Sequence, residues 1–265
     1  MSPENETDSQ RFQLTQGGGV AVITLDHPPA NAIDGVMIAA LARAFADLEK
    51  DTEVRAIIIT GGDGRMFSAG ADVNFLIKSP PEAVEKLTAD GTELMDRIES
   101  FPKPVIAAVN GLALGGGNEL AMACDVRIAA ESARFGLPEI NLGLIPGWGG
   151  IQRLSRILGK GRAAEAVMTG AMIKAQDALA MGLVNKLVPD ADLMTEARAM
   201  AEKFASMAPL AMATIKRRLV DGLGEPLGKA VREDVKAFAV NFRTKDAREG
   251  ITAFLEKRPP QFKGE

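Results

Sequence analysis

Glu119 is an isolated charge in an apolar segment. The residues from Gly111 to Cys124 contain no other charged side chain, and they predict a helix that is apolar on nearly every side, as is typical of a buried helix. A carboxylate in such a place is costly unless it is paired or its pKa rises. Glu119 therefore has two interpretations: a catalytic carboxyl group, or half of a buried ion pair with Arg127 or Arg153.

Glu139 is a second isolated carboxyl group. It is the only carboxylate between Glu131 and Glu165, and its neighbours are apolar. Two such groups can serve one small substrate as general acid and general base. The 20 positions between Glu119 and Glu139 are too many for one helix face, so only the tertiary fold can bring these side chains together.

Clustered glycines suggest a site for an anion or an oxyanion. Gly115, Gly116 and Gly117 come just before the predicted helix, where backbone N–H groups lie free at the positive end of the helix dipole. A second N–H from the loop 68–72 would complete a pair that holds a carbonyl oxygen, an effect worth about 2.7–4 kcal/mol per donor. The alternative is a phosphate loop, but neither stretch matches the nucleotide-binding glycine patterns.

The elements that must position these residues alternate between strands and helices. Apolar runs predict buried strands at 55–60, 104–109 and 126–130, and glycines 17–19 predict a hairpin between strands 12–14 and 20–25. Helices are predicted from Asp34, which suits an N-cap, and from Pro80-Pro81, which suit a first turn. This alternation indicates an α/β core with parallel pairing.

The C-terminal third is predicted to be helical. One β-type run remains there, at 183–188, among helical segments near 161–169, 174–181, 190–207, 209–221, 226–242 and 244–257. We place a boundary between 200 and 209. The resulting division is a disordered tail at 1–10, a core at 11–200 and a helical region at 201–265 that packs on its own chain or on a neighbouring subunit.

Composition excludes several classes of protein. Among 265 residues, 31 Lys+Arg against 35 Asp+Glu give a net charge of −4, which argues against nucleic-acid binding, and no apolar run is long enough to span a membrane. The single cysteine, Cys124, cannot form an internal disulfide, and the single histidine, His27, cannot build a His-rich metal site. The acidic first ten residues resemble no signal or transit peptide, so we expect a cytoplasmic protein.

Seven ordered motifs and a characteristic C-terminus resemble the crotonase, or enoyl-CoA hydratase/isomerase, family from about Val22 to Lys263. The motifs are His27-Pro-Pro-Ala-Asn-Ala32, Phe67-Ser-Ala-Gly-Ala-Asp72, Lys103-Pro-Val-Ile-Ala-Ala-Val-Asn-Gly111, Ala113-Leu-Gly-Gly-Gly-Asn-Glu-Leu-Ala121, Phe135-Gly-Leu-Pro-Glu139, Gly143-Leu-Ile-Pro-Gly147, Gln152-Arg-Leu154 and the terminal Glu256-Lys-Arg-Pro-Pro-Gln-Phe-Lys263. The ordered set is far more specific than any single motif.

The resemblance implies a fold, an assembly and a set of site residues. The fold would be a crotonase-like spiral of ββα units with a C-terminal helical trimerisation region, assembled as a homotrimer or a dimer of trimers. The oxyanion hole would be formed by the N–H groups of Ala71 and Gly116, and Glu119 and Glu139 would be catalytic. The residues implied to bind substrate or coenzyme A are Ala30, Ala69, Gly70, Asp72, Gly147, Phe262 and Lys263.

The resemblance also implies a reaction, the reversible syn addition of water across the 2,3 double bond of an enoyl-CoA ester. Glu119 would take a proton as water attacks C3, and Glu139 would deliver one to C2. The substrate would be an acyl-CoA, with coenzyme A as part of it and with no metal and no other cofactor. The acyl group stays open between straight, branched and cyclic forms, as does the pathway.

Two residues depart from the hydratase pattern. Asn118 precedes the first glutamate where a smaller or apolar residue is common, and Trp148 follows Pro146-Gly147. Both are candidates for shaping the acyl pocket, and plain core packing is the alternative for Trp148. His27 is interpreted as a solvated loop residue, Cys124 as a small buried hydrophobe and Asp125 as a turn or pairing residue.

Several other functions are alternatives to hydration. An enoyl-CoA isomerase would use mainly Glu139, so the presence of Glu119 favours a hydratase; other acyl-CoA lyases of this fold arrange different groups at the oxyanion hole. An RNA-binding relative needs clustered cations, and the densest basic patch is Lys216-Arg217-Arg218. A catalytically silent scaffold is disfavoured by the two glutamates and the glycine loops.

Overall fold

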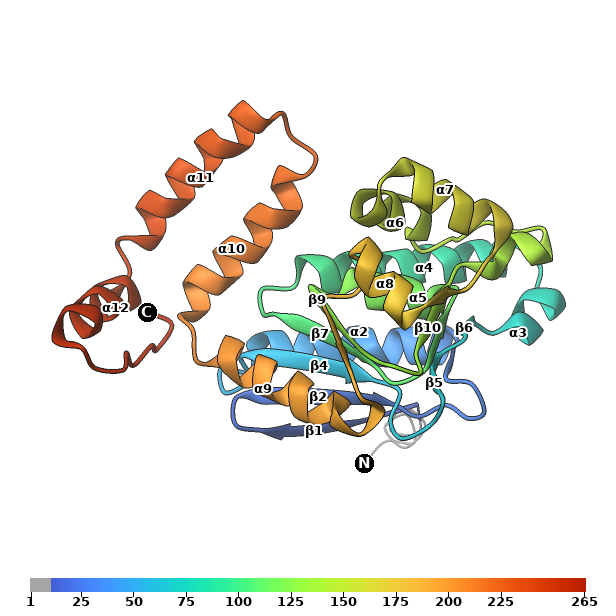
Figure 1. Cartoon of the computed structure of the whole chain (residues 1–265), viewed down its shortest axis with the longest axis horizontal. Helices are drawn as coiled ribbons and strands as arrows, with labels where there is room; N and C mark the ends of the chain where they lie inside the picture. The colour runs from blue at the N-terminus through green and yellow to red at the C-terminus, as the bar shows by residue number, and fades with distance from the viewer. Residues whose placement is uncertain (1–10) are drawn as a thin grey trace.

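The structure, a computed structural model, describes residues 11–265. The tail predicted at 1–10 lies outside the described residues. In the described chain, four of the six strands of a large sheet are each followed by one or two short strands of smaller sheets and then by a helix, so that ββα units follow one another in a spiral (Figure 1). The predicted α/β spiral fold is confirmed.

The elements have the following bounds. The large sheet of the described residues has the order β1 (Phe12–Gly17), β2 (Val20–Leu25), β4 (Ala56–Thr60), β7 (Val105–Val109), β9 (Val126–Ala130) and β12 (Lys186–Val188). A second sheet has the order β11 (Ile173–Lys174), β10 (Arg134–Gly136), β8 (Leu112–Leu114) and β5 (Met66–Ser68), and β3 (Ala32–Ile33) pairs with β6 (Gly70–Ala71). The helices are α2 (Gly35–Lys50), α3 (Val73–Lys78), α4 (Pro81–Ser100), α5 (Gly116–Ala123), α6 (Gly150–Leu158), α7 (Lys160–Thr169), α8 (Ala175–Met181), α9 (Leu193–Ala205), α10 (Pro209–Gly222), α11 (Leu227–Asn241) and α12 (Lys245–Glu256), with 3-10 turns η1 (Pro138–Leu142) and η2 (Asp190–Asp192).

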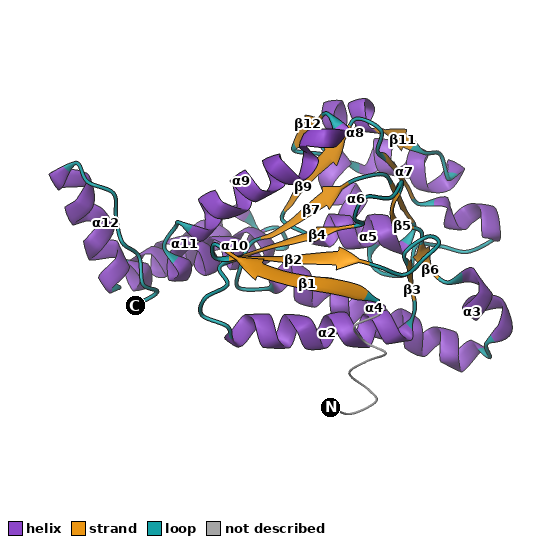
Figure 2. Cartoon of the chain, turned by 90° about the horizontal axis from the view of Figure 1, so that it is seen from below, coloured by secondary structure: helices purple, strands orange, loops and turns teal. Residues whose placement is uncertain are grey.

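The large sheet is covered on both faces. On β4, Ile57 and Ile59 face the core formed with α2, α4 and α5, whereas Ile58 faces the layer formed with α9. Figure 2 shows α9 on one side of the sheet and α2 on the other. Because parallel strands buried on both faces need no polar residues, they read as continuous apolar runs, and the strands predicted at 55–60, 104–109 and 126–130 are confirmed.

The predicted helix starts are also confirmed. The Asp34 side chain accepts a hydrogen bond of 2.8 Å from Met37 N–H at the start of α2, and α4 begins at Pro81. We do not predict α3, α6 or the short strands β3, β5, β6, β8 and β10 from the sequence. Strands of two or three residues are too short to show an alternating pattern.

A helical arm projects from the core. It consists of α10, α11 and α12, drawn in orange to red in Figure 1. Positions 200 and 201, where we place the start of the helical region, lie inside α9, which packs on the sheet through Ala197, Ala201 and Ala205. The arm therefore leaves the core after α9.

Lys216 anchors the arm to the core and does not belong to a basic surface patch. It is buried on α10, and its ammonium donates to Asp125 Oδ2 at 2.7 Å and to the carbonyl of Ile98 at 3.0 Å. Arg218 is ion-paired with Asp234 at 2.8 Å. The run Lys216-Arg217-Arg218 therefore does not form a free basic patch of the kind that RNA binding needs, because two of its three cations are held by carboxylates.

We expect Asp125→Ala to destabilise the protein by about 3 kcal/mol, because it leaves the buried Lys216 ammonium without its counter-ion. This value is at the low end for a buried pair, since the Asp125 side chain is 28% exposed. Urea denaturation measures the effect. The double variant Asp125→Ala/Lys216→Met should recover most of the loss, and an Asp125→Ala variant as stable as the wild type would contradict the anchoring role.

None of the helices in residues 11–265 has both the length and the apolar character needed to cross a membrane.

Candidate active site

Three neighbouring parallel strands bring three loops to one edge of the second sheet. β8 pairs with β5 on one side and with β10 on the other, with Leu114 opposite Gly136. The loop 69–72 follows β5, the start of α5 follows β8, and η1 follows β10. Since the carboxyl ends of parallel strands meet at one edge, Glu119 and Glu139 come together despite the 20 positions between them.

Glu119 is buried and bound only by backbone groups among the described residues. This residue of α5 is 2% exposed. Its Oε1 accepts hydrogen bonds from Trp148 N–H at 2.8 Å and from Gly150 N–H at 2.7 Å. Burial, reinforced by the negative charge of Glu139, raises the pKa of Glu119 to about 7, although the two N–H donors and Arg153 oppose the rise. Glu119 thus changes its charge near neutral pH.

The ion-pair interpretation of Glu119 is wrong. Arg127 donates to backbone carbonyls, at 2.6 Å to Leu183 and 2.7 Å to Cys124. Arg153 is ion-paired with Asp96 and Glu99 at 2.7 Å. Neither arginine is ion-paired or hydrogen-bonded to Glu119 within residues 11–265, and Arg153 acts on this carboxyl group only through its charge, which lowers the pKa less than burial raises it.

Glu139 faces the same space from η1. Its side chain is half-buried, and its Oε2 has no hydrogen-bond partner among the described residues. Its Oε1 lies 3.0 Å from the position that a Cβ on Gly115 would take, which places it at the start of α5. Burial raises the pKa of Glu139, so both carboxyl groups of the site are easier to protonate than ordinary ones.

The candidate oxyanion donors lie beside each other. Gly70, with a φ of +82°, packs against the start of α5, where a Cβ would lie 2.4 Å from the nitrogen of Gly116. The N–H groups of Ala69 and Gly70 are already bound, to Ala30 O at 2.9 Å and to Ser68 Oγ at 3.1 Å. Ala71 is the next residue of this loop, and Gly116 is the first residue of α5, whose N–H has no acceptor within its own helix.

Asn31 is bound to β5, the strand that leads into the loop 69–72, a contact that we do not predict from the sequence. Its side-chain amide donates to the carbonyls of Gly61, Met66 and Phe67 at 3.1–3.3 Å. β3 then pairs in parallel with β6, with Ile33 opposite Ala71. The motif His27-Pro-Pro-Ala-Asn-Ala32 carries the signal, because it contains one amide side chain among apolar residues.

Trp148 forms a wall of the site. Its buried indole ring lies against two glycines, since a Cβ on Gly116 would be 2.1 Å from its Cζ3 and a Cβ on Gly91 would be 2.3 Å from its Nε1. Asn118 is also buried, and its amide donates to Gly136 O at 3.4 Å, while its Oδ1 has no partner within residues 11–265. Trp148 therefore links the candidate oxyanion donor to α4.

The remaining predicted binding residues are spread more widely. The exposed Gly147 accepts a hydrogen bond from Thr92 beside the site, and Asp72 caps α3 through Asn74 N–H. Phe262 and Lys263 lie at the end of the arm, where Arg55 binds the Phe262 carbonyl and Asp246 binds the Lys263 N–H. Within one chain, these last two residues are therefore held beside Arg55 and α12, and Figure 1 shows the C-terminus away from α5, the helix that carries Glu119.

The arrangement suits acid–base chemistry on a carbonyl compound. Two carboxyl groups of raised pKa face one space beside the candidate oxyanion donors, the N–H groups of Ala71 and Gly116. Within residues 11–265, no group of three or more His, Cys, Asp or Glu side chains is placed to hold a metal ion. The fold is the crotonase fold, and the site is a pair of carboxyl groups at its strand-to-helix loops.

Comparisons with known proteins agree with this fold and its sequence motifs. The family model described as enoyl-CoA hydratase/isomerase matches residues 15–265, and the chain belongs to this family. It is 47% identical to a probable enoyl-CoA hydratase of Bacillus subtilis, over 93% of this chain and 96% of the relative. It is 42% identical to a short-chain-enoyl-CoA hydratase of Clostridium acetobutylicum, over 92% and 94% of the two chains. The crystal structure of an enoyl-CoA hydratase from Bacillus anthracis superposes with a TM-score of 0.94 at 39% identity, covering 97% of this chain and all of that one.

Proposed function

We propose that this chain is an enoyl-CoA hydratase that adds water reversibly across the 2,3 double bond of a 2-enoyl-CoA. The observation that carries the proposal is the pair of carboxyl groups of raised pKa, Glu119 on α5 and Glu139 at the start of α5, which lie close enough for the charge of Glu139 to act on Glu119. An isomerase needs one such group, whereas hydration uses two. The names of the Bacillus and Clostridium relatives support the same reaction.

In the proposed reaction, one carboxyl group is ionised while the other is protonated. The ionised Glu119 takes a proton from water as the water oxygen attacks C3, and the double-bond electrons move toward the thioester carbonyl. The N–H groups of Ala71 and Gly116 stabilise the negative oxygen that forms. Glu139 then delivers its proton to C2, which completes the syn addition. These steps use only groups of the chain and water, so the proposal includes no metal and no cofactor other than the coenzyme A carried by the substrate.

The substrate to test first is a 2-enoyl-CoA with a short acyl chain. The indole of Trp148 fills the space between Gly91 and Gly116, next to the place where the thioester carbonyl would bind. The Clostridium relative is named a short-chain-enoyl-CoA hydratase, which supports the same choice.

The test is the loss of the conjugated enoyl-thioester ultraviolet absorbance with crotonyl-CoA. We expect rapid loss with the wild-type protein and almost none with Glu119→Gln or Glu139→Gln. If the wild type is inert on crotonyl-CoA and longer 2-enoyl-CoAs, but converts a 3-enoyl-CoA even as Glu119→Gln, the protein is an isomerase and the proposal fails.

The rate of hydration should depend on pH near neutrality. Because only ionised Glu119 accepts the proton, and its pKa is raised to about 7, kcat/KM with crotonyl-CoA should fall about tenfold per pH unit below pH 7. The two carboxyl groups interact and titrate as a pair, so the pKa that describes the fall in rate at acid pH, the acid limb of the profile, is a property of both groups together. A pH profile from 5.5 to 8 measures it, and a flat profile over this range would contradict the role of Glu119.

We also propose that the arm joins copies of this chain into a homo-oligomer, a trimer or a dimer of trimers. The arm exposes large apolar side chains, including Phe238, Phe242 and Phe254, and Phe238 and Phe242 line a groove of about 730 Å³. Phe262 and Lys263 lie on the same arm, so any contact with coenzyme A would reach from one copy to the site of another. Light scattering during gel filtration distinguishes a monomer, a trimer and a hexamer.

A further inference from the structure

The position of the Glu119 carboxyl group depends on one short turn. Both of its hydrogen-bond donors, Trp148 N–H and Gly150 N–H, belong to the turn 147–150, and both bind the same oxygen, Oε1. Gly149, between them, has a φ of +92°, which is left-handed and typical of a tight turn. A small rotation of this turn would therefore move both donors away from the carboxyl group.

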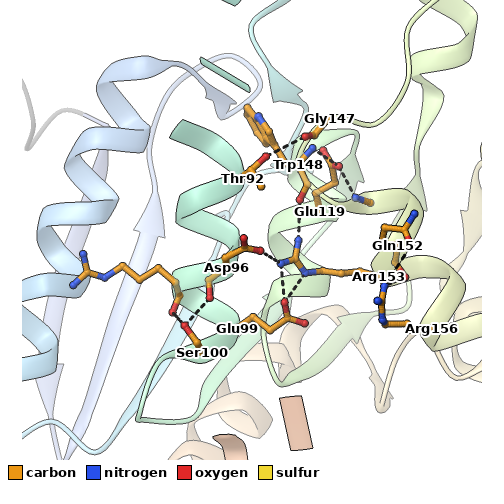
Figure 3. A network of polar contacts seen from close by, with 12 residues as sticks. Thr92, Asp96, Glu99, Ser100, Glu119, Gly147, Trp148, Gln152, Arg153 and Arg156 are labelled. Atoms are coloured by element: carbon orange, nitrogen blue, oxygen red, sulfur yellow. Dashed lines mark hydrogen bonds and ion pairs between the residues drawn. The ribbon is translucent and has the colours of Figure 1, made fainter. Parts of the chain in front are cut away.

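Two side chains hold the peptide planes of this turn. Thr92 Oγ1 lies 3.1 Å from Gly147 O and 2.9 Å from Thr88 O, so its single hydrogen is shared between these two carbonyls. The Gly147 carbonyl shares its peptide plane with the Trp148 N–H that binds Glu119. Arg153 Nη1 donates to Trp148 O at 2.8 Å and so holds the next plane. The two contacts approach from different helices, α4 and α6, and Figure 3 shows both beside Glu119.

Arg153 is itself held rigidly by α4. Its Nη2 donates to Asp96 Oδ1 and Glu99 Oε2, both at 2.7 Å, and its Nε donates to Glu99 Oε2 at 3.1 Å. The guanidinium group thus binds two carboxylates and one carbonyl at once, in a side chain that is 8% exposed. A lysine ammonium carries the same charge, but it lacks the planar fork that makes these contacts together.

We propose that Arg153, fixed by Asp96 and Glu99, is a positioning residue that holds the turn 147–150 so that its N–H groups fix the carboxyl group of Glu119. Thr92 performs the same task from the other side of the turn. The network deepens the proposed function, because it connects α4 and α6 to the proposed base without touching the substrate. In the sequence, the proposed positioning residue is the arginine of the motif Gln152-Arg-Leu154.

The network also acts on the ionisation of Glu119. The charged groups that act on this carboxyl group are Glu139 from η1, which raises its pKa, and Arg153 from α6, which lowers it together with the two N–H donors. Asp96 and Glu99 of α4 face Arg153. Removal of Arg153 takes away its positive charge and loosens the two donors, and both changes disfavour the carboxylate.

The variants Arg153→Gln, Arg153→Lys and Thr92→Val test the proposal, with Arg127→Gln as the matched control. Arg127 is also a buried arginine that binds backbone carbonyls, but its side chain donates to Leu183, Ala121 and Cys124 and not to the turn. Three readouts are needed: kcat and KM with crotonyl-CoA, the pH profile, and an infrared titration of the Glu119 carboxyl stretch, assigned by difference from Glu119→Gln. Thermal unfolding monitors the stability of each variant.

We expect Arg153→Gln to lower kcat about 10–100-fold with KM changed less than about threefold, because the base is displaced while the binding surface stays. Its Glu119 titration and acid limb should move to higher pH by about one unit. Arg153→Lys should recover part of the pH shift, and Thr92→Val should lower kcat by a smaller factor. Arg127→Gln should lose stability but keep the wild-type pH dependence.

The proposal is overturned if Arg153→Gln keeps the wild-type Glu119 titration, or if Arg127→Gln shifts it equally. The infrared titration does not rely on the proposed function. A wild type that is inert on every enoyl-CoA, with a Glu119 titration that still shifts in Arg153→Gln, would refute hydration and leave the positioning role intact.

Discussion

Glu119→Gln is expected to lower hydration of crotonyl-CoA about a thousandfold, the middle of the range for loss of a general base. The same substitution is expected to make the protein more stable at pH 8. The two effects have one cause, since the carboxylate that would accept the proton is ionised inside the protein. A glutamine keeps an Oε1 that accepts from Trp148 and Gly150, but it carries no charge.

The sign of the stability effect follows from the direction of the pKa shift. Glu119 has a pKa of about 7 in the folded chain against an ordinary value of 4.5. Between these values the folded state binds more protons than the unfolded state, so stability falls as the pH rises from 4.5 to 7. At about 1.4 kcal/mol per pKa unit, the loss at pH 8 is on the order of 3 kcal/mol, and Glu119→Gln removes it.

Urea denaturation at pH 5 and pH 8 measures this effect. The variant and the wild type should differ little at pH 5, and the variant should be more stable at pH 8 by about 2–3 kcal/mol. Glu131→Gln is the control, because Glu131 is exposed and lies outside the site. A Glu119→Gln variant that is less stable than the wild type at pH 8 would show that the ionised carboxyl group stabilises the fold.

Gly116→Ala is expected to lower activity about 100–1000-fold, the usual cost of losing one oxyanion donor. The added Cβ would lie 2.1 Å and 2.4 Å from Cζ3 and Cε3 of Trp148, far inside van der Waals contact. Either the indole or the start of α5 must move, and the N–H of Gly116 moves with the latter. Overpacking of this kind also destabilises, by about 1–3 kcal/mol or more.

A double-mutant cycle with Trp148→Ala isolates this contact. Trp148→Ala alone should cost about 3–5 kcal/mol through the cavity that it creates, but it removes the atoms that Gly116→Ala would meet. The double variant should therefore be more stable than the sum of the two single effects predicts. Gly161→Ala is the control, because a Cβ there meets nothing within 4 Å. Strict additivity would show that the indole does not confine Gly116.

The regular elements could be predicted because their signals are local. The strand at 104–109 reads as an uninterrupted apolar run, since β7 is buried on both faces, and Asp34 caps α2 through a bond to a residue three positions away. The short strands β5, β8 and β10 could not be predicted, although they position the whole site. Each has three residues, and its existence depends on partners far along the chain.

In the candidate site, too, the sequence reveals some features and only the tertiary structure decides the others. Glu119 and Glu139 stand out in the sequence because a charge in an apolar segment is costly and needs a reason. Their meeting was decided by the parallel pairing of β8 with β10, which no local pattern encodes. The tertiary structure likewise decided that Glu119 accepts hydrogen bonds from Trp148 and Gly150, and that Arg153 is ion-paired with Asp96 and Glu99.

The sequence by itself determined which residues are apolar, where helices begin and which carboxyl groups are isolated, and its ordered motifs determined the family. The tertiary structure alone decided which isolated groups face each other, and which partners set their charge. The physical reason is that hydrophobic periodicity and capping involve residues within one or two turns of each other. The pKa of Glu119 depends instead on desolvation and on charges and N–H donors supplied by η1, α6 and the turn 147–150.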